Sequence, residues 1–177
     1  QLQVTSDAVN VLREDLDVAF VVEPVESSDL IRHVISDTPL IWVASPSYLN
    51  QVTIPDSIAG LLPHLKFCER RYLSPSLNVM TPRGPQTIDT TRLMSVNDPV
   101  ILRDIVIQGG GVALLPELYC RRYLKGGALA RVCPSITLQN TARISALTAH
   151  RRLQPKKAQI MIDFVKECLN DYATYLR

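Results

Sequence analysis

The stretch NDPVILRDIVIQGGGVALLP, residues 97–116, carries the signals for a helix start, a helix end and a following strand. Asn97 or Asp98 can accept hydrogen bonds from the free N–H groups of a first helical turn, and Pro99 suits the first helical position. Apolar residues then recur at helical spacing, which predicts one buried helix face. The glycines at 109–111 supply positive-φ conformations that end a helix, and VALL predicts a strand buried on both faces. A helix N-terminus beside the end of a buried strand can bind an anion in an α/β crevice.

Away from this stretch, short apolar runs alternate with amphipathic segments. Residues 30–35 alternate apolar and polar side chains, which predicts a half-exposed strand, and the turn residues at 82–85 predict a hairpin within 77–96. Strands that alternate with helices predict an α/β fold with a mainly parallel sheet and helices on both faces. Further strands are predicted at 18–22, 40–44, 65–68, 129–132 and 144–148, and further helices near Tyr48, at 55–62 with Asp56 as the cap, at 117–125, and from Pro155 onward.

Composition narrows the functions that are compatible with this chain. Its 177 residues carry a net charge of +2 and are 46% hydrophobic, which is typical of a globular protein and argues against this segment gripping DNA phosphates by itself. No apolar run approaches the roughly 20 residues of a membrane span. The three histidines lack metal-binding spacing, and there is no GxSxG elbow or P-loop, so no enzyme, metal site or cofactor is predicted. The cysteines form no CxxC pair, which predicts buried thiols at Cys68, Cys120, Cys133 and Cys168.

Four segments, taken together, resemble the effector-binding domain of LysR-type transcriptional regulators. The stretch at 97–116 is similar to the family pattern ND-x-x-x-LR-x-x-x-x-x-G-x-G-(I/V)-A-LLP. LREDLDVAFVV at 12–22, TPLIWVASPSYL at 38–49 and the segment 142–167 are similar to three other family segments in the same order. The resemblance spans nearly the whole chain and implies a cytoplasmic ligand sensor rather than an enzyme.

The resemblance also implies a two-lobed α/β fold of the type 2 periplasmic-binding-protein kind, with a ligand cleft between the lobes. Residues 1–37 and 145–177 would form lobe one, and residues 38–144 would form lobe two, with crossings near 36–39 and 141–144. Family domains begin with a strand and a helix upstream of the position that matches Gln1. That element and the DNA-binding winged helix are expected to be missing from this sequence, and the chain is therefore expected to be a fragment.

The candidate effector-binding residues are Thr5, Ser6, Val22, Phe67, Cys68, Arg70, Asn97 and Asp98. Thr5 and Ser6 occupy a strand-to-helix turn where the family places a hydroxyl against a ligand, although Ser6 also suits an N-cap. Phe67 and Cys68 end a strand that would face the cleft, and ordinary core packing is the alternative. Asn97 and Asp98 open a helix, where capping and ligand contact are compatible.

Val22 departs from the family pattern. Many members have an arginine at this position, where a guanidinium can clamp a carboxylate with two hydrogen bonds. Two interpretations of Arg70 and Arg71 stay open: they replace that clamp from the other lobe, or they are solvated surface residues. With solvated arginines, the cleft would favour a more apolar effector.

The predicted partners are a small-molecule effector, carboxylate-bearing if the arginines take part, and other copies of the chain. Family members pair through their first lobe, and full-length proteins form tetramers; DNA would be bound only by the missing N-terminal domain. The alternative function is a solute-binding protein of the same fold that delivers a small molecule to a transporter. An upstream helix-turn-helix sequence would separate the two.

Overall fold

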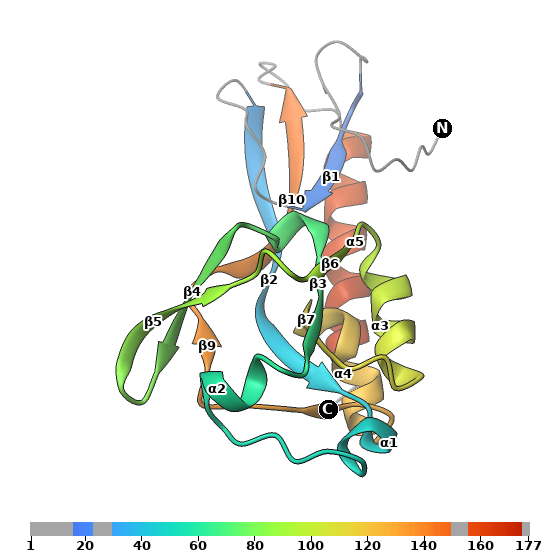
Figure 1. Ribbon diagram of the computed structural model, residues 1–177. Coiled ribbons are helices and arrows are strands. Elements are labelled where there is room, and N and C mark those ends of the chain that lie inside the picture. The colour runs from blue at the N-terminus through green and yellow to red at the C-terminus, as the bar shows by residue number, and fades with distance from the viewer. Residues whose placement is uncertain (1–15, 23–29, 150–155, 175–177) are drawn as a thin grey trace. The chain divides into compact units, whose positions relative to one another are not determined.

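The computed structural model describes residues 16–22, 30–149 and 156–174, the last five through their backbone alone. These residues fall into two compact units. Unit 1 comprises the described residues up to Asp37 and those from Ala142 onward, and unit 2 comprises Thr38–Thr141. Figure 1 labels most elements of both units.

Unit 1 is built on antiparallel strands and one long helix. Strand β1 (Ala19–Val22) pairs antiparallel with β10 (Thr141–Ala149), with Ala19 opposite Leu147, and β10 lies between β1 and β2 (Leu30–Ala44) in the strand order. The predicted last strand is confirmed, although it begins three residues earlier than expected. The predicted C-terminal helix is α5 (Lys156–Thr174), which buries Ala158 and Ile162.

Strand β2 is continuous where the sequence predicts two strands. The predicted half-exposed strand at 30–35 and the predicted buried strand at 40–44 are the two ends of one 15-residue strand. Pro39 lies inside it, is exposed, and immediately precedes the residue at which pairing with β7 begins. Proline is compatible with extended backbone where no ladder hydrogen bond is needed from its nitrogen, so it does not interrupt this strand.

The larger sheet of unit 2 is mixed. Strand β7 (Val112–Pro116) pairs antiparallel with β2 on one side and parallel with β3 (Leu65–Glu69) on the other. Strand β6 (Met94–Val96) pairs parallel with β3, and β8 (Ala130–Arg131) pairs with β2. The prediction of a mainly parallel sheet is therefore only partly right. The pattern of apolar residues in a strand predicts its burial, but it does not predict whether the neighbouring strand runs parallel or antiparallel.

Two helices cover the core of unit 2. Helix α3 (Pro99–Ile107) packs on β7 and on α4 (Glu117–Lys125), and Figure 1 shows both helices beside β7. Gly109 and Gly111 have φ values of 87° and 122°, which confirms the predicted helix stop. Gly110 is restricted by space instead, since a Cβ there would lie 2.7 Å from Ile105 Cγ2. The buried cluster between these elements contains Ile41, Val43, Leu102, Val106, Ala113, Leu115, Cys120 and Leu129.

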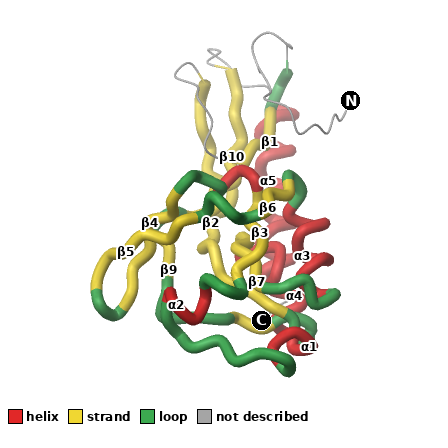
Figure 2. The backbone as a smooth tube through the Cα atoms, in the orientation of Figure 1, coloured by secondary structure: helices red, strands yellow, loops and turns green. Residues whose placement is uncertain are grey.

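A second, three-stranded sheet of unit 2 contains the predicted hairpin. Strands β4 (Ser76–Thr81) and β5 (Gly84–Asp89) pair along their full length, and β9 (Thr137–Leu138) pairs with β4 (Figure 2). Short helices occur at α1 (Pro46–Leu49) and α2 (Ile58–Leu61). The N-cap of α2 is Ser57, not the predicted Asp56, whose carboxylate accepts a hydrogen bond from the Ser135 hydroxyl at 2.7 Å.

Candidate functional site

The parallel strands of unit 2 end at one edge of the sheet. In the parallel register, Glu69 at the end of β3 lies opposite Val96 at the end of β6, and Cys68 lies opposite Leu114 in β7. Beyond these ends, the chain enters the 3₁₀ turn η1 (Arg70–Tyr72), α3 and α4. The carboxyl ends of parallel strands and the N-termini of the following helices are where α/β proteins place ligands.

Asp98 is the N-cap of α3. Its Oδ1 atom accepts hydrogen bonds from the backbone N–H groups of Val100 at 2.7 Å and Ile101 at 3.2 Å. Asn97 precedes it and is exposed. Of the two capping residues that the sequence allowed, the structure selects Asp98, while a ligand contact by either residue stays a prediction.

Glu69 is the main feature of this edge that the sequence analysis missed. Only 4% of the residue is exposed, and burial raises the pKa of its carboxyl group above the ordinary value. Arg71 opposes that rise: its backbone N–H donates to Glu69 Oε1 at 3.3 Å, and its Nε lies 3.7 Å from the same oxygen. The signal was present, because Glu69 directly follows a predicted strand, but a glutamate at a strand end is usually exposed.

Two tyrosines lie near this carboxyl group. Burial raises the phenol pKa of both Tyr72 and Tyr119, and Glu69 raises each further. Within the described residues, the Tyr72 hydroxyl is buried and has no hydrogen-bond partner. A buried hydroxyl without a partner carries a cost that a bound ligand or water can remove. We call the following residues the edge cluster: Glu69, Arg71, Tyr72, Asp98 and Tyr119.

The predicted site residues occupy both units. Phe67 is half-buried and packs against the core cluster, while Cys68 is fully buried and donates its thiol hydrogen to the Glu69 carbonyl oxygen at 3.4 Å. Arg70 is exposed in η1, next to the edge cluster. Val22 is half-buried at the end of β1 in unit 1, opposite Ile144. Thr5 and Ser6 lie outside the described residues.

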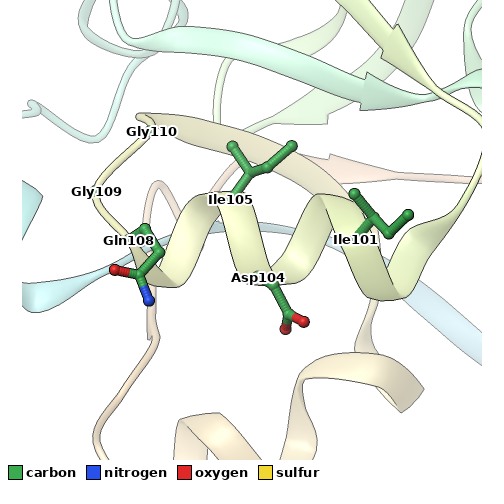
Figure 3. Close-up of a pocket in the computed structure, with 6 residues that line it drawn as sticks. All are labelled: Ile101, Asp104, Ile105, Gln108, Gly109 and Gly110. Atoms are coloured by element: carbon green, nitrogen blue, oxygen red, sulfur yellow. The ribbon is translucent and has the colours of Figure 1, made fainter.

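An open hollow lies along α3. Its lining residues are Ile101, Asp104, Ile105, Gln108, Gly109 and Gly110. Figure 3 shows Ile101 and Ile105 on one side of the helix, and Asp104 and Gln108 on the other. The hollow is mainly apolar, and its one carboxylate already accepts two hydrogen bonds from Arg103. It shares no residue with the edge cluster.

Two further features bear on function. Within the described ranges, no group of three or more His, Cys, Asp or Glu residues is placed to hold a metal ion. His64 is engaged instead in a hydrogen bond between its Nδ1 atom and the Tyr48 hydroxyl, at 2.9 Å. No helix in the described part of the chain is long and apolar enough to cross a membrane.

Comparisons with known proteins agree with this architecture. The chain is 28% identical over 170 residues to the HTH-type transcriptional activator AaeR of Escherichia coli K12, covering 93% of the chain and 52% of the relative. The chain therefore spans about half the length of the curated relatives it matches. Full-length AphB, the Vibrio cholerae virulence activator and a member of the LTTR protein family, superposes with a TM-score of 0.76 at 27% identity, over 94% of this chain and 57% of that one.

A more distant structure shares the fold. The regulatory domain of CrgA, a LysR-type transcriptional regulator from Neisseria meningitidis, superposes with a TM-score of 0.74 at 21% identity, over 92% of this chain and 80% of that one. The model of the LysR substrate binding domain matches residues 1–170. The match covers nearly the whole sequence, including all of unit 2 and its polar sheet edge, and so the chain belongs to the LysR substrate-binding domain family.

Proposed function

We propose that the chain is the ligand-sensing regulatory domain of a LysR-type, DNA-binding transcriptional regulator, and that its effector contacts the edge cluster of unit 2. One observation carries the proposal. In this chain, which belongs to the family, three features lie at one end of the parallel strands: the buried Glu69 carboxylate, the buried Tyr72 hydroxyl, which has no hydrogen-bond partner among the described residues, and the N-terminus of α3. Groups of this kind fix the orientation of a small ligand.

The charges at the edge favour an effector that both donates and accepts hydrogen bonds. The exposed Arg70 and the pair formed by Arg71 with Glu69 offer guanidinium groups to a ligand carboxylate. The buried Glu69 carboxyl group offers an acceptor to a ligand hydroxyl or amine. We therefore propose a small hydroxy- or amino-carboxylate, which these opposite charges can hold at two points.

A thermal-shift screen tests the proposal. The panel contains aliphatic and aromatic carboxylates, hydroxy acids, amino acids and, as neutral compounds, sugars. A ligand at 100 times its Kd stabilises by about 2.7 kcal/mol, which for a domain of this size is a shift of several degrees. A saturable shift with hydroxy- or amino-carboxylates supports the proposal, and a shift with sugars alone contradicts the proposed chemistry.

Two substitutions locate the site. Glu69→Gln and Arg70→Ala are each expected to weaken binding about tenfold or more, because each removes one charged hydrogen-bond partner. Arg83→Ala is the control, since Arg83 is exposed in the turn between β4 and β5. Ligand binding that survives both edge substitutions unchanged, with all three proteins folded, would place the effector elsewhere.

The remaining parts of the proposal concern the whole protein. We propose that it acts in the cytoplasm, binds DNA only through a separate domain, and associates as a dimer and a tetramer. Gel-shift assays with the full-length regulator test this: DNA binding should require the additional domain, and effector should change the affinity or the pattern of complexes. A transporter-linked solute-binding protein would give no DNA complex.

A further inference from the structure

Glu69 of the edge cluster is a buried carboxyl group whose cation is loosely placed. Its side chain is 5% exposed. The backbone N–H of Arg71 donates to Glu69 Oε1 at 3.3 Å, and Arg71 Nε lies 3.7 Å from the same oxygen. A well-formed hydrogen bond between a charged nitrogen and a carboxylate measures about 2.7–2.9 Å. Both contacts are longer than this, so they compensate a buried negative charge only in part.

Several titratable or charged groups surround Glu69 electrostatically. They come from β3, η1, α3 and α4, and they are Cys68, Arg71, Tyr72, Asp98 and Tyr119. Burial is the largest cause that raises the pKa of Glu69, Asp98 raises this pKa further, and Arg71 lowers it. Burial also raises the pKa values of the thiol and of both phenols, so these three groups are neutral near pH 7. The named groups therefore include two carboxyl groups and one guanidinium group.

An ammonium group is the ligand chemistry that suits this charge balance. In surroundings of low dielectric constant, a carboxylate gains more from a cation than from a neutral hydroxyl, because the cation compensates its charge and also donates a hydrogen bond. An ammonium group has three donors. The Tyr72 hydroxyl near Glu69 is buried and has no hydrogen-bond partner in the described part of the chain, so its oxygen offers a second acceptor.

We propose that the effector carries an ammonium group that binds Glu69, and that its binding displaces the proton that Glu69 holds in the effector-free domain at acidic pH. The proton passes from the carboxyl group to the buffer, while the ammonium group keeps its own protons. This inference rests on the proposed effector site at the edge cluster. It narrows the ligand class from hydroxy- or amino-carboxylates to amino-carboxylates.

The displaced proton gives effector binding a pH dependence of defined sign. Burial holds the pKa of Glu69 above its ordinary 4.5 in the free domain, whereas a bound ammonium group lowers this pKa in the complex. Effector affinity should therefore rise about tenfold per pH unit between the two pKa values and level off above the free-domain pKa. The amine stays protonated below about pH 7.5, so it does not obscure this rise. A hydroxy acid brings no positive charge and should show no such rise.

Matched ligand pairs test the ammonium group. Each pair shares one carbon skeleton: alanine with lactate, phenylalanine with phenyllactate, and aspartate with malate. Titration calorimetry from about pH 5 to 7, in two buffers of different ionisation enthalpy, measures both the Kd and the number of protons released. We expect an amino acid to bind with proton release at the acidic end of the range. Its hydroxy partner should bind at least about tenfold more weakly at pH 7 and release no proton.

Substitutions assign the proton to Glu69. Glu69→Gln should abolish both the proton release and the rise of affinity with pH. Asp98→Asn removes a negative neighbour, so it should move the pH at which affinity levels off downward, and Arg71→Gln should move it upward. A purely structural role for these residues would not give opposite shifts, and both variants remain informative if Glu69→Gln does not fold. Arg83→Ala, in the exposed turn between β4 and β5, is the control and should leave the pH profile unchanged.

The possible outcomes separate this inference from the proposed function. An amino acid that binds without releasing a proton and with affinity independent of pH would overturn the inference. So would an unchanged pH profile in Glu69→Gln, or in both Asp98→Asn and Arg71→Gln. Binding by hydroxy acids alone would reject the ammonium group but leave the carboxylate site at the edge cluster standing. A panel in which no carboxylate binds would reject both proposals.

Discussion

The N-cap of α3 supports a quantitative prediction, because one carboxylate holds the first turn of a helix that the core requires. Asp98→Ala removes the acceptor of two backbone hydrogen bonds, from Val100 and Ile101. Loss of an N-cap side chain costs about 1 kcal/mol, within a range of about 0.5–2. The helix buries Leu102 and Val106 completely, so fraying of its first turn disturbs the core of unit 2. We expect a loss near the middle of that range.

Asp98→Asn separates the hydrogen bonds from the charge. Asparagine caps helices about as well as aspartate, so this variant keeps the hydrogen bonds and loses only the interaction of the negative charge with the helix dipole. We expect it to lose about 0.3–1 kcal/mol, less than the alanine variant loses. Asp104→Ala is the matched control on the same helix, because Asp104 is exposed and accepts from the neighbouring Arg103. It should change stability by less than about 0.5 kcal/mol.

Urea unfolding followed by tryptophan fluorescence measures these losses of stability in unit 2, the unit that contains α3. Trp42 is the single tryptophan of the sequence, is 2% exposed, and donates its indole hydrogen to the Ile136 carbonyl oxygen at 2.8 Å, all within unit 2. With an m-value of about 1–3 kcal/mol/M, a loss of about 1 kcal/mol lowers the midpoint by roughly 0.3–1 M. An Asp98→Ala midpoint equal to that of Asp104→Ala would show that the cap contributes nothing, and would refute the reasoning.

Three further predictions concern the core, the thiols and the buried carboxyl group. Leu102→Ala should destabilise unit 2 by about 3–5 kcal/mol, because Leu102 is fully buried and leaves a cavity; the same fluorescence assay measures it, and a loss under about 1 kcal/mol would contradict the packing. In the folded chain, the exposed Cys168 should react with a thiol reagent, while the other three cysteines should react only after unfolding in urea. The reason is that burial raises the pKa of Cys68 and Cys120 to about 12 and also raises the pKa of Cys133, which keeps these thiols protonated. Burial raises the folded-state pKa of Glu69 above its ordinary 4.5, so the folded state holds this proton more tightly and the chain loses stability as the pH rises from about 4.5 through that raised pKa. Melting temperatures of the wild type and Glu69→Gln across pH 4 to 8 should therefore diverge in favour of the variant as the pH rises, and parallel curves would show that Glu69 does not take up a proton on folding.

Local signals in the sequence were sufficient to predict the central helix, its stop and the following strand. Proline at the first helical position, an acidic cap and glycines at positive φ act within a few residues of chain, so their effects do not depend on the rest of the fold. The same wording identified the family, and the family identified the two-lobed α/β architecture. The hairpin β4–β5 was predictable for the same local reason.

Tertiary structure was needed wherever a residue depends on a distant neighbour. Burial periodicity shows that β2 and β7 are covered, but their antiparallel pairing depends on how strands far apart in sequence meet. Likewise, the continuity of β2 through Pro39 follows from where pairing with β7 begins. Asp98 caps α3 in preference to Asn97, although both are good caps, because only the folded backbone determines which carboxyl or amide oxygen reaches the free N–H groups.

Glu69 shows the same division most clearly. Its sequence neighbours place it at a strand end, which on average is an exposed position for a glutamate. Its burial accompanies the pairing of β3 with β6 and the packing of α3 on β3, and its raised pKa arises from that burial. Local sequence was therefore sufficient to predict most helices and strands and the family. The buried carboxyl group at the sheet edge, by contrast, forms only when segments that are distant in the chain pack together.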